Sequence, residues 1–219
     1  MKTAPISDFT PTSELITLHG LGFVQVVLPP LAGFGGTALA ARRLHVWHPE
    51  LPRRRCFEHS QIHNHRFGFE SLVILGEQVN IDYRLIDAGD GELMQPTHLG
   101  YSHEGPRGPN GGRPWTPAFS TMPQVADIKR IKAGRTYTVQ PFDYHATRPG
   151  TEDGITVTLM TKGEELPSPA TSLCAIGVQP EADFDRFQWA PSRLWAIVLD
   201  ALGGKAAARH LLDLEPSAE

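Results

Sequence analysis

Four residues with metal-ligating side chains stand in a distinctive arrangement: His63 and His65, then Glu70, and much later His145. On a strand, residues two apart project to one face, so His63 and His65 can point together. Glu70 lies five residues after His65, which is the wrong parity for one straight strand, and we expect the chain to bend at Gly68. His145 follows a Pro-x-Asp turn at the start of another strand-like segment. Three imidazoles and a carboxylate would suit Fe, Mn, Ni or Zn.

Arginine and tyrosine residues near these positions suggest how a substrate could be bound. Arg66 and Arg148 are candidate substrate-binding residues, because arginine pairs well with a carboxylate. Tyr83 and Tyr144 are candidate catalytic residues, since a tyrosine hydroxyl can hydrogen-bond a developing anion or a bound oxygen. The alternation of its segment turns Tyr83 toward the interior, where core packing and pocket lining both remain open.

Other histidines have simpler interpretations. His45 and His48 lie in a strand-like segment, and we interpret both as ordinary strand residues. His98 and His103 fall in a segment of little periodicity. We expect both in a solvated loop, with a lid over the site as the alternative.

Composition narrows the class of protein. The 219 residues carry 20 Lys+Arg and 24 Asp+Glu, a net charge of −4, which does not favour nucleic-acid binding. No apolar run is long enough to span a membrane, and the first residues lack the apolar core of a secretory signal, so we expect a cytoplasmic protein. Two cysteines exclude a disulfide-stapled fold. The 21 Gly and 19 Pro favour many short strands joined by turns.

Hydrophobic alternation predicts an all-β fold. Strands are predicted at 23–28, 42–48, 70–75, 78–86, 127–132, 135–140, 144–147, 154–161 and 172–178. Gly76-Glu77 suggests a hairpin between the third and fourth of these. Residues 88–125 have little periodicity and are expected to form a long surface excursion.

Helices are expected only near the two ends of the sequence. A short helix capped by Thr12 or Ser13 is predicted before Gly20, and two amphipathic helices are predicted at 192–202 and 205–214. We therefore expect one β-barrel or sandwich domain over 1–190 and a helical extension over 191–219. Exposed strand edges and the apolar C-terminal helix also make a homodimer plausible.

Two segments resemble the conserved motifs of the cupin superfamily. HNHRFGFESLVILG is similar to the first motif, and GRTYTVQPFDYHATRPG resembles the second, although Asp143 stands where glycine is expected and no asparagine follows His145 at the usual place. HNHRFGFE is also locally similar to pirins, but these would need a second barrel. The cupin resemblance covers about 60–161 and implies a small jelly-roll barrel. It also implies that His63, His65, Glu70 and His145 bind one divalent metal.

The resemblance leaves three functions open. The first is an Fe(II) dioxygenase for a small organic substrate, with two metal positions free for substrate and O₂ or water, and an apolar wall drawn from Leu72, Ile74, Val157 and Leu159. The second is a non-redox isomerase, lyase or decarboxylase with Mn, Ni or Zn as Lewis acid. The third is a non-enzymatic ligand-binding cupin. Thiol dioxygenases resemble this architecture but typically lack the motif glutamate, so Glu70 disfavours them.

Overall fold

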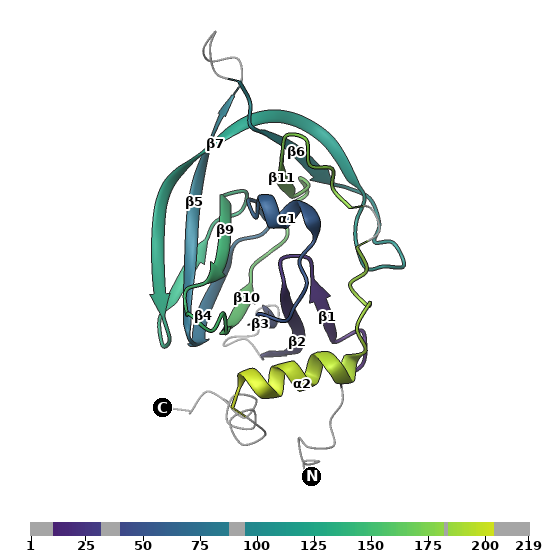
Figure 1. Cartoon of the computed structure of the whole chain (residues 1–219), viewed down its shortest axis with the longest axis vertical. Helices are drawn as coiled ribbons and strands as arrows, with labels where there is room; N and C mark the ends of the chain where they lie inside the picture. Colours follow the sequence, from purple (N-terminus) through teal and green to yellow (C-terminus); the bar gives the residue numbers. More distant parts are fainter. Residues whose placement is uncertain (1–10, 32–39, 88–94, 182–183, 204–219) are drawn as a thin grey trace.

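The computed structural model describes residues 11–31, 40–87, 95–181 and 184–203, and its architecture confirms the predicted all-β, cupin-type barrel (Figure 1). Within this part of the chain the strands form two antiparallel sheets that curve around a shared interior. Sheet A has the order β1-β2-β3-β10-β4-β8, and sheet B has the order β11-β6-β7-β5-β9. The strands are β1 (Ile16–His19), β2 (Phe23–Leu31), β3 (Ala40–Trp47), β4 (Phe69–Leu75), β5 (Glu77–Asp87), β6 (His98–His103), β7 (Trp115–Lys132), β8 (Thr136–Val139), β9 (Tyr144–Pro149), β10 (Thr156–Lys162) and β11 (Thr171–Ala175).

The apolar core lies on the outer side of sheet A, beneath the helix α2 (Pro191–Ala201). Leu194 and Val198 of α2 are almost fully buried against Val46 and Val157 of the sheet. Because neighbouring residues of a strand alternate between faces, this packing leaves the intervening residues of β3 and β10 for the barrel interior. Sheet A therefore presents its hydrophobic face to a helix and its more polar face to the inside.

The helices differ from the prediction in part. The helix predicted after Thr12 is wrong: a turn precedes the strand β1, which pairs with β2 from Ile16 onward. A short helix, α1 (Arg55–His59), was not predicted. The first predicted C-terminal helix is α2, whereas the second, at 205–214, lies outside the described residues. Neither described helix is long and apolar enough to cross a membrane.

The expected excursion at 88–125 is also corrected. Residues 88–94 lie outside the described part, but the remainder contributes β6 and the first half of β7 to sheet B. Prolines within β7 obscured this strand in the sequence. Pro117 lies where β7 pairs only with β6, and Pro123 lies where it pairs only with β5. Each proline thus has one unpaired side on which its missing N–H is tolerated.

The predicted hairpin at Gly76 is wrong as well. β4 pairs with β8 and β10 in sheet A, whereas β5 pairs with β7 and β9 in sheet B. Gly76 has φ of 76°, and a Cβ there would stand 2.6 Å from the carbonyl oxygen of Ile155. Glycine accordingly allows the chain to turn a tight corner from one sheet to the other.

Candidate metal centre

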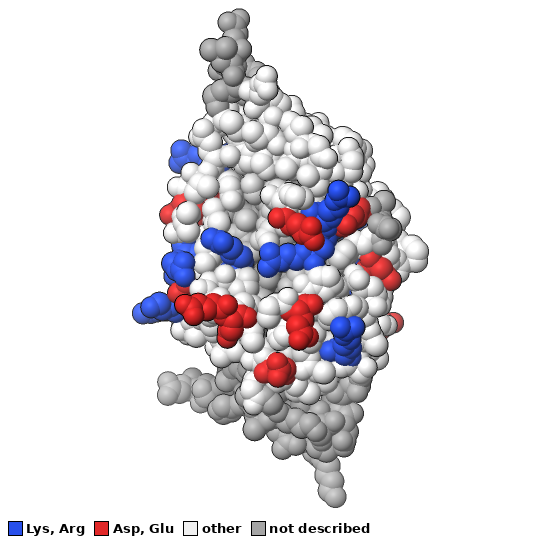
Figure 2. All heavy atoms as spheres, in the orientation of Figure 1, with Lys and Arg blue, Asp and Glu red and all other residues white. Residues whose placement is uncertain are grey.

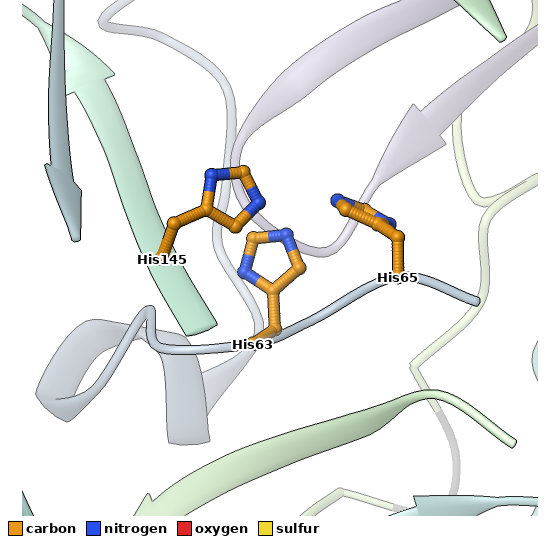
Figure 3. A group of neighbouring side chains, drawn as sticks. All are labelled: His63, His65 and His145. Carbon is orange, nitrogen blue, oxygen red and sulfur yellow. The ribbon is translucent and has the colours of Figure 1, made fainter. Parts of the chain in front are cut away.

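Three histidines converge inside the barrel (Figure 3). Their candidate ligand nitrogens, from His63, His65 and His145, all lie within 4.8 Å of one another. His63 lies in an extended segment that bridges to β9, where His63 and His145 exchange two backbone N–H···O hydrogen bonds of 2.9 Å. Asn64, between the two ligands, turns the other way, and its side-chain oxygen accepts the Thr171 backbone N–H at 2.7 Å. The His-x-His spacing thus places both imidazoles on the inner side, as predicted.

The hydrogen bonds of the rings leave ligand nitrogens free. Nδ1–H of His63 donates to the Gln61 carbonyl at 2.8 Å. Nδ1–H of His145 donates to Oδ1 of Asn80 at 3.0 Å, because the Asn80 amide nitrogen is occupied in donating to Asp82 at 2.6 Å. Nε2 of His145 is buried without a hydrogen-bond partner in the described structure. A metal ion requires a nitrogen lone pair that is free, and a hydrogen bond at the opposite ring nitrogen orients that lone pair. These residues therefore fit a metal ion.

Electrostatics also favours the ligating form of the rings. Burial lowers the pKa of His63, and it lowers the pKa of His65 and His145 well below 6.5. For His65 and His145, the positive charge that His63 would carry lowers the pKa further. The three imidazoles are therefore neutral near pH 7, and neutral imidazole is the state that binds metals.

Glu70 is not brought to this group. It lies on the exposed face of β4, opposite Thr138 and Thr161 of the neighbouring strands. Phe69 and Ser71, on the alternate face, line the interior instead. The bend expected at Gly68 does not change the parity enough to turn the carboxylate inward, and the described site consists of three histidines.

The histidines lie in a cavity of about 700 Å³ whose wall combines polar side chains with aromatic and aliphatic ones. From sheet A it is lined by Gln25, His45, Ser71, Thr158 and Met160, and from sheet B by Gln78, His103, His145 and Thr147. The expected apolar wall is corrected here. Val157 and Ile74 pack in the cluster beneath α2, and neither Leu72 nor Leu159 lines the cavity. The apolar alternation was identified correctly, but these four residues lie on the outer side of sheet A, and the cavity is lined by their neighbours on the other face, such as Phe69 and Ser71.

The candidate tyrosines and arginines are placed differently from one another. Tyr83 and Tyr144 pack with Leu173 on the face of sheet B that is turned away from the histidines. The Tyr144 hydroxyl is hydrogen-bonded to Oγ1 of Thr171 at 2.5 Å. Arg66 does line the cavity and forms an ion pair with Glu165, whereas Arg148 is exposed outside it. Among the four, only Arg66 shares the cavity with the histidines.

Several cavity residues were missed by the sequence reasoning. His19, His45 and His103 all line the cavity, although the last two were interpreted as a strand residue and a loop residue. Tyr137 also lines it, and burial raises its pKa to about 12, so its hydroxyl remains a hydrogen-bond donor. The alternation of Arg43, His45 and Trp47 along β3 was an available signal, since these three successive positions of one face carry polar or aromatic side chains.

Comparisons with known proteins give structural matches only. No protein-family model matches the chain, and no curated protein sequence does. Among solved structures, L-ribose isomerase from Acinetobacter sp. DL28 has 17% identity and a TM-score of 0.33, over 64% of this chain and 59% of that one. An uncharacterized conserved protein with a double-stranded beta-helix domain from Klebsiella pneumoniae has 13% identity and a TM-score of 0.32, over 76% and 96%. A hypothetical protein from Leishmania major has 12% identity and a TM-score of 0.35, over 70% and 81%. The chain spans about three fifths of the length of the isomerase, and similarities this distant carry no argument about substrate or activity.

Proposed function

We propose that the protein is a metal-dependent enzyme that uses one divalent ion as a Lewis acid on a small polar molecule, as an isomerase, lyase or decarboxylase would. The observation that carries this proposal is the group of three neutral imidazoles that share one cavity, two of them buried and His65 half-buried, with the Nε2 of His145 left without a hydrogen-bond partner. When bound, the ion would polarise a substrate oxygen and lower the pKa of a bound water. Zn, Mn and Ni suit this chemistry, and Fe(II) suits the same ligands.

The protein's own side chains would bind and orient the substrate. Gln78 and Thr147 from sheet B, with Ser71 and Thr158 from sheet A, bring amide and hydroxyl groups to the cavity wall. Such groups hydrogen-bond hydroxyl and carbonyl oxygens, and the barrel around them limits access of water. Aromatic side chains such as Trp47 and Phe69 line the same cavity, so the wall suits a molecule that has both polar and apolar parts.

The dioxygenase hypothesis is less favoured by this arrangement. The ligand set typical of non-haem Fe(II) oxygenases combines two histidines with one carboxylate. Here the third ligand is His145, and Glu70 lies on the other face of β4. A set of three neutral ligands instead occurs in catalytic zinc sites that activate water. We therefore place Lewis-acid chemistry before the oxygenases that need a carboxylate ligand. Because Glu70 lies outside the site, it no longer disfavours thiol dioxygenases, and these are the second candidate.

Elemental analysis by inductively coupled plasma mass spectrometry tests the proposal. The wild-type protein would be compared with His63→Ala and His145→Ala, with His59→Ala as the control because His59 is exposed at the end of α1. We expect near-stoichiometric Zn, Mn or Ni in the wild type and the control, and loss of the metal in both site variants.

Other outcomes would contradict the proposal in distinct ways. Stoichiometric iron with substrate-dependent oxygen uptake would restore the dioxygenase hypothesis. A wild-type protein that holds no metal, and takes up none of Fe(II), Mn(II), Ni(II) or Zn(II), would leave a non-enzymatic ligand-binding barrel.

A further inference from the structure

The cavity that contains the histidines carries a surplus of positive charge. Among the described residues, its wall includes six arginines but two carboxylate side chains. The arginines are Arg43, Arg54, Arg66, Arg107, Arg113 and Arg186, and the carboxylates are Glu165 and Glu181. On the outer face in Figure 2, by contrast, basic and acidic side chains lie beside one another. The surplus is therefore a property of the cavity and not of that outer face.

Both carboxylates already have partners. Glu165 forms ion pairs with Arg66 and Lys162. Glu181 accepts a hydrogen bond of 2.6 Å from the backbone N–H of Arg55. These contacts hold the two acidic side chains in place on the wall and use much of their capacity to accept hydrogen bonds.

Three of the arginines have only neutral partners or none. The guanidinium of Arg43, on β3, makes no hydrogen bond or ion pair within the described part of the chain. Arg107 donates to the carbonyl of Gly111 at 2.5 Å, and Arg186 donates to Oγ1 of Thr17 at 3.1 Å. A guanidinium has five N–H donors, so each retains donors that can face the cavity.

The three guanidinium groups are also close enough to repel one another. Burial, together with the charges of Arg107 and Arg43, lowers the pKa of Arg186 to about 10. Burial and the charge of Arg107 lower the pKa of Arg43, and the negative charge of Glu165 offsets only part of this effect. Like charges gathered in one partly desolvated cavity are unfavourable until a counter-charge is bound there.

The arginines share the cavity with the histidine group. His45 follows Arg43 by two residues on β3, so both project to the inner face. His19 has both groups within electrostatic range, because the charges of Arg186 and of His63 each lower its pKa after the larger effect of burial. One molecule in a cavity of about 700 Å³ can therefore meet arginines at one part and imidazoles at another.

We propose that the substrate is a small organic anion whose carboxylate or phosphate group is bound by Arg43, Arg107 and Arg186, with the remainder of the molecule directed toward the three histidines. The role of this anion as a substrate rests on the proposed function, whereas binding of the anion by the arginines needs no metal. Arginine matches both oxyanions because its planar fork of N–H groups donates two parallel hydrogen bonds. A neutral sugar would leave these donors without a charged partner.

Calorimetric titration of the metal-free protein tests the anion site. Succinate and inorganic phosphate are the probes, uncharged succinamide is the matched neutral compound, and the salt concentration is held constant. We expect saturable binding of at least one anion and none of succinamide. The preferred anion distinguishes a carboxylate from a phosphate substrate.

Arg43→Gln is the informative variant, because the substitution removes no side-chain hydrogen bond or ion pair of the described structure. We expect its anion affinity to fall about 10-fold to 100-fold, the range for removing a charged hydrogen bond, with partial retention in Arg43→Lys. Arg148→Gln is the control, since Arg148 is exposed outside the cavity and should bind the anion like the wild type. Equal losses in the two glutamine variants, or binding of neither anion by the wild type, would overturn the proposal.

The same titration on His145→Ala separates this inference from the proposed function. If His145→Ala binds the anion normally and the wild type binds no metal, the anion site stands and the enzyme proposal fails. If the wild type binds metal but no anion, the arginine site fails and the metal centre stands.

Discussion

Removing the Asn80 side chain should weaken metal binding without a direct change to any ligand. Asn80 is 2% exposed and accepts the Nδ1–H of His145 at 3.0 Å. Its amide nitrogen donates to Asp82, which in turn accepts from Lys129 at 2.6 Å. This chain fixes the rotation and tautomer of His145, so that Nε2 carries the free lone pair. In Asn80→Ala the imidazole loses that orientation, and its Nδ1–H is left buried without a partner.

The expected magnitude follows from that one contact. Loss of a hydrogen bond that orients a ligating histidine typically costs 10-fold to 100-fold in metal affinity. At about 1.4 kcal/mol for each factor of ten, this is about 1.4–2.7 kcal/mol, which agrees with the cost of about 1–3 kcal/mol for an unsatisfied buried donor. Competition titration with Zn(II) and a chromophoric chelator at pH 7.5 would measure it.

Gln78→Ala is the matched control. Gln78 is on the same strand, is 1% exposed and lines the same cavity, but its amide donates to the carbonyl of Arg148 at 2.9 Å and makes no hydrogen bond to an imidazole of the described structure. It should lose comparable stability and retain wild-type Zn(II) affinity. Unchanged affinity in folded Asn80→Ala, or an equal loss in Gln78→Ala, would refute the argument that this hydrogen bond orients the ligand.

Three further predictions concern stability. Burial lowers the pKa of His45 to about 3 and of His103 to about 4, so below pH 6.5 the unfolded chain binds protons that the folded chain does not. The free energy of unfolding of the metal-free protein should therefore decrease by about 2–4 kcal/mol from pH 6.5 to 5. The decrease should be smaller in His45→Gln. A free energy from urea unfolding that does not change with pH would contradict this prediction. Leu194→Ala should destabilise the fold by about 2–5 kcal/mol, because this side chain is 1% exposed and lies between α2 and sheet A. A decrease of less than about 1 kcal/mol in the free energy of chemical unfolding would count against that packing. Gly76→Ala should lower the melting temperature more than Gly134→Ala does, since both glycines have positive φ but only at Gly76 would a Cβ press against a backbone carbonyl. Equal melting temperatures of the two variants would show that the corner at Gly76 tolerates a side chain.

Hydrophobic alternation predicted the period of the strands correctly, but some of their faces lie on the other side of the sheet. Along β5 the alternation was taken to turn Tyr83 toward the interior, and Val79 and Ile81 share its face. The structure buries Asn80 on the histidine side instead, where it contacts His145. Hydrophobic periodicity shows that two faces differ, but it does not show which one faces the inside of a barrel with a polar cavity.

Long-range pairing accounts for the other errors. Gly76 was interpreted as a hairpin turn because the apolar segments on its two sides are adjacent in sequence, yet they pair with distant strands in opposite sheets. The prolines of β7 argued against a strand until its staggered pairing with β6 and β5 was known. Neither pairing has a local signature, since each depends on residues dozens of positions away.

The amino-acid sequence by itself determined the all-β class, the short strands and the three histidines, because alternation, turn residues and the His-x-His spacing are local properties. Tertiary structure alone decided that Glu70 lies outside, that Tyr83 and Tyr144 are turned away from the cavity, and that arginines from distant segments share it with the histidines. The physical reason is the closure of the barrel. Covering one face of sheet A with α2 gives that face a large apolar cluster, and the opposite face then encloses a cavity in which arginines outnumber carboxylates.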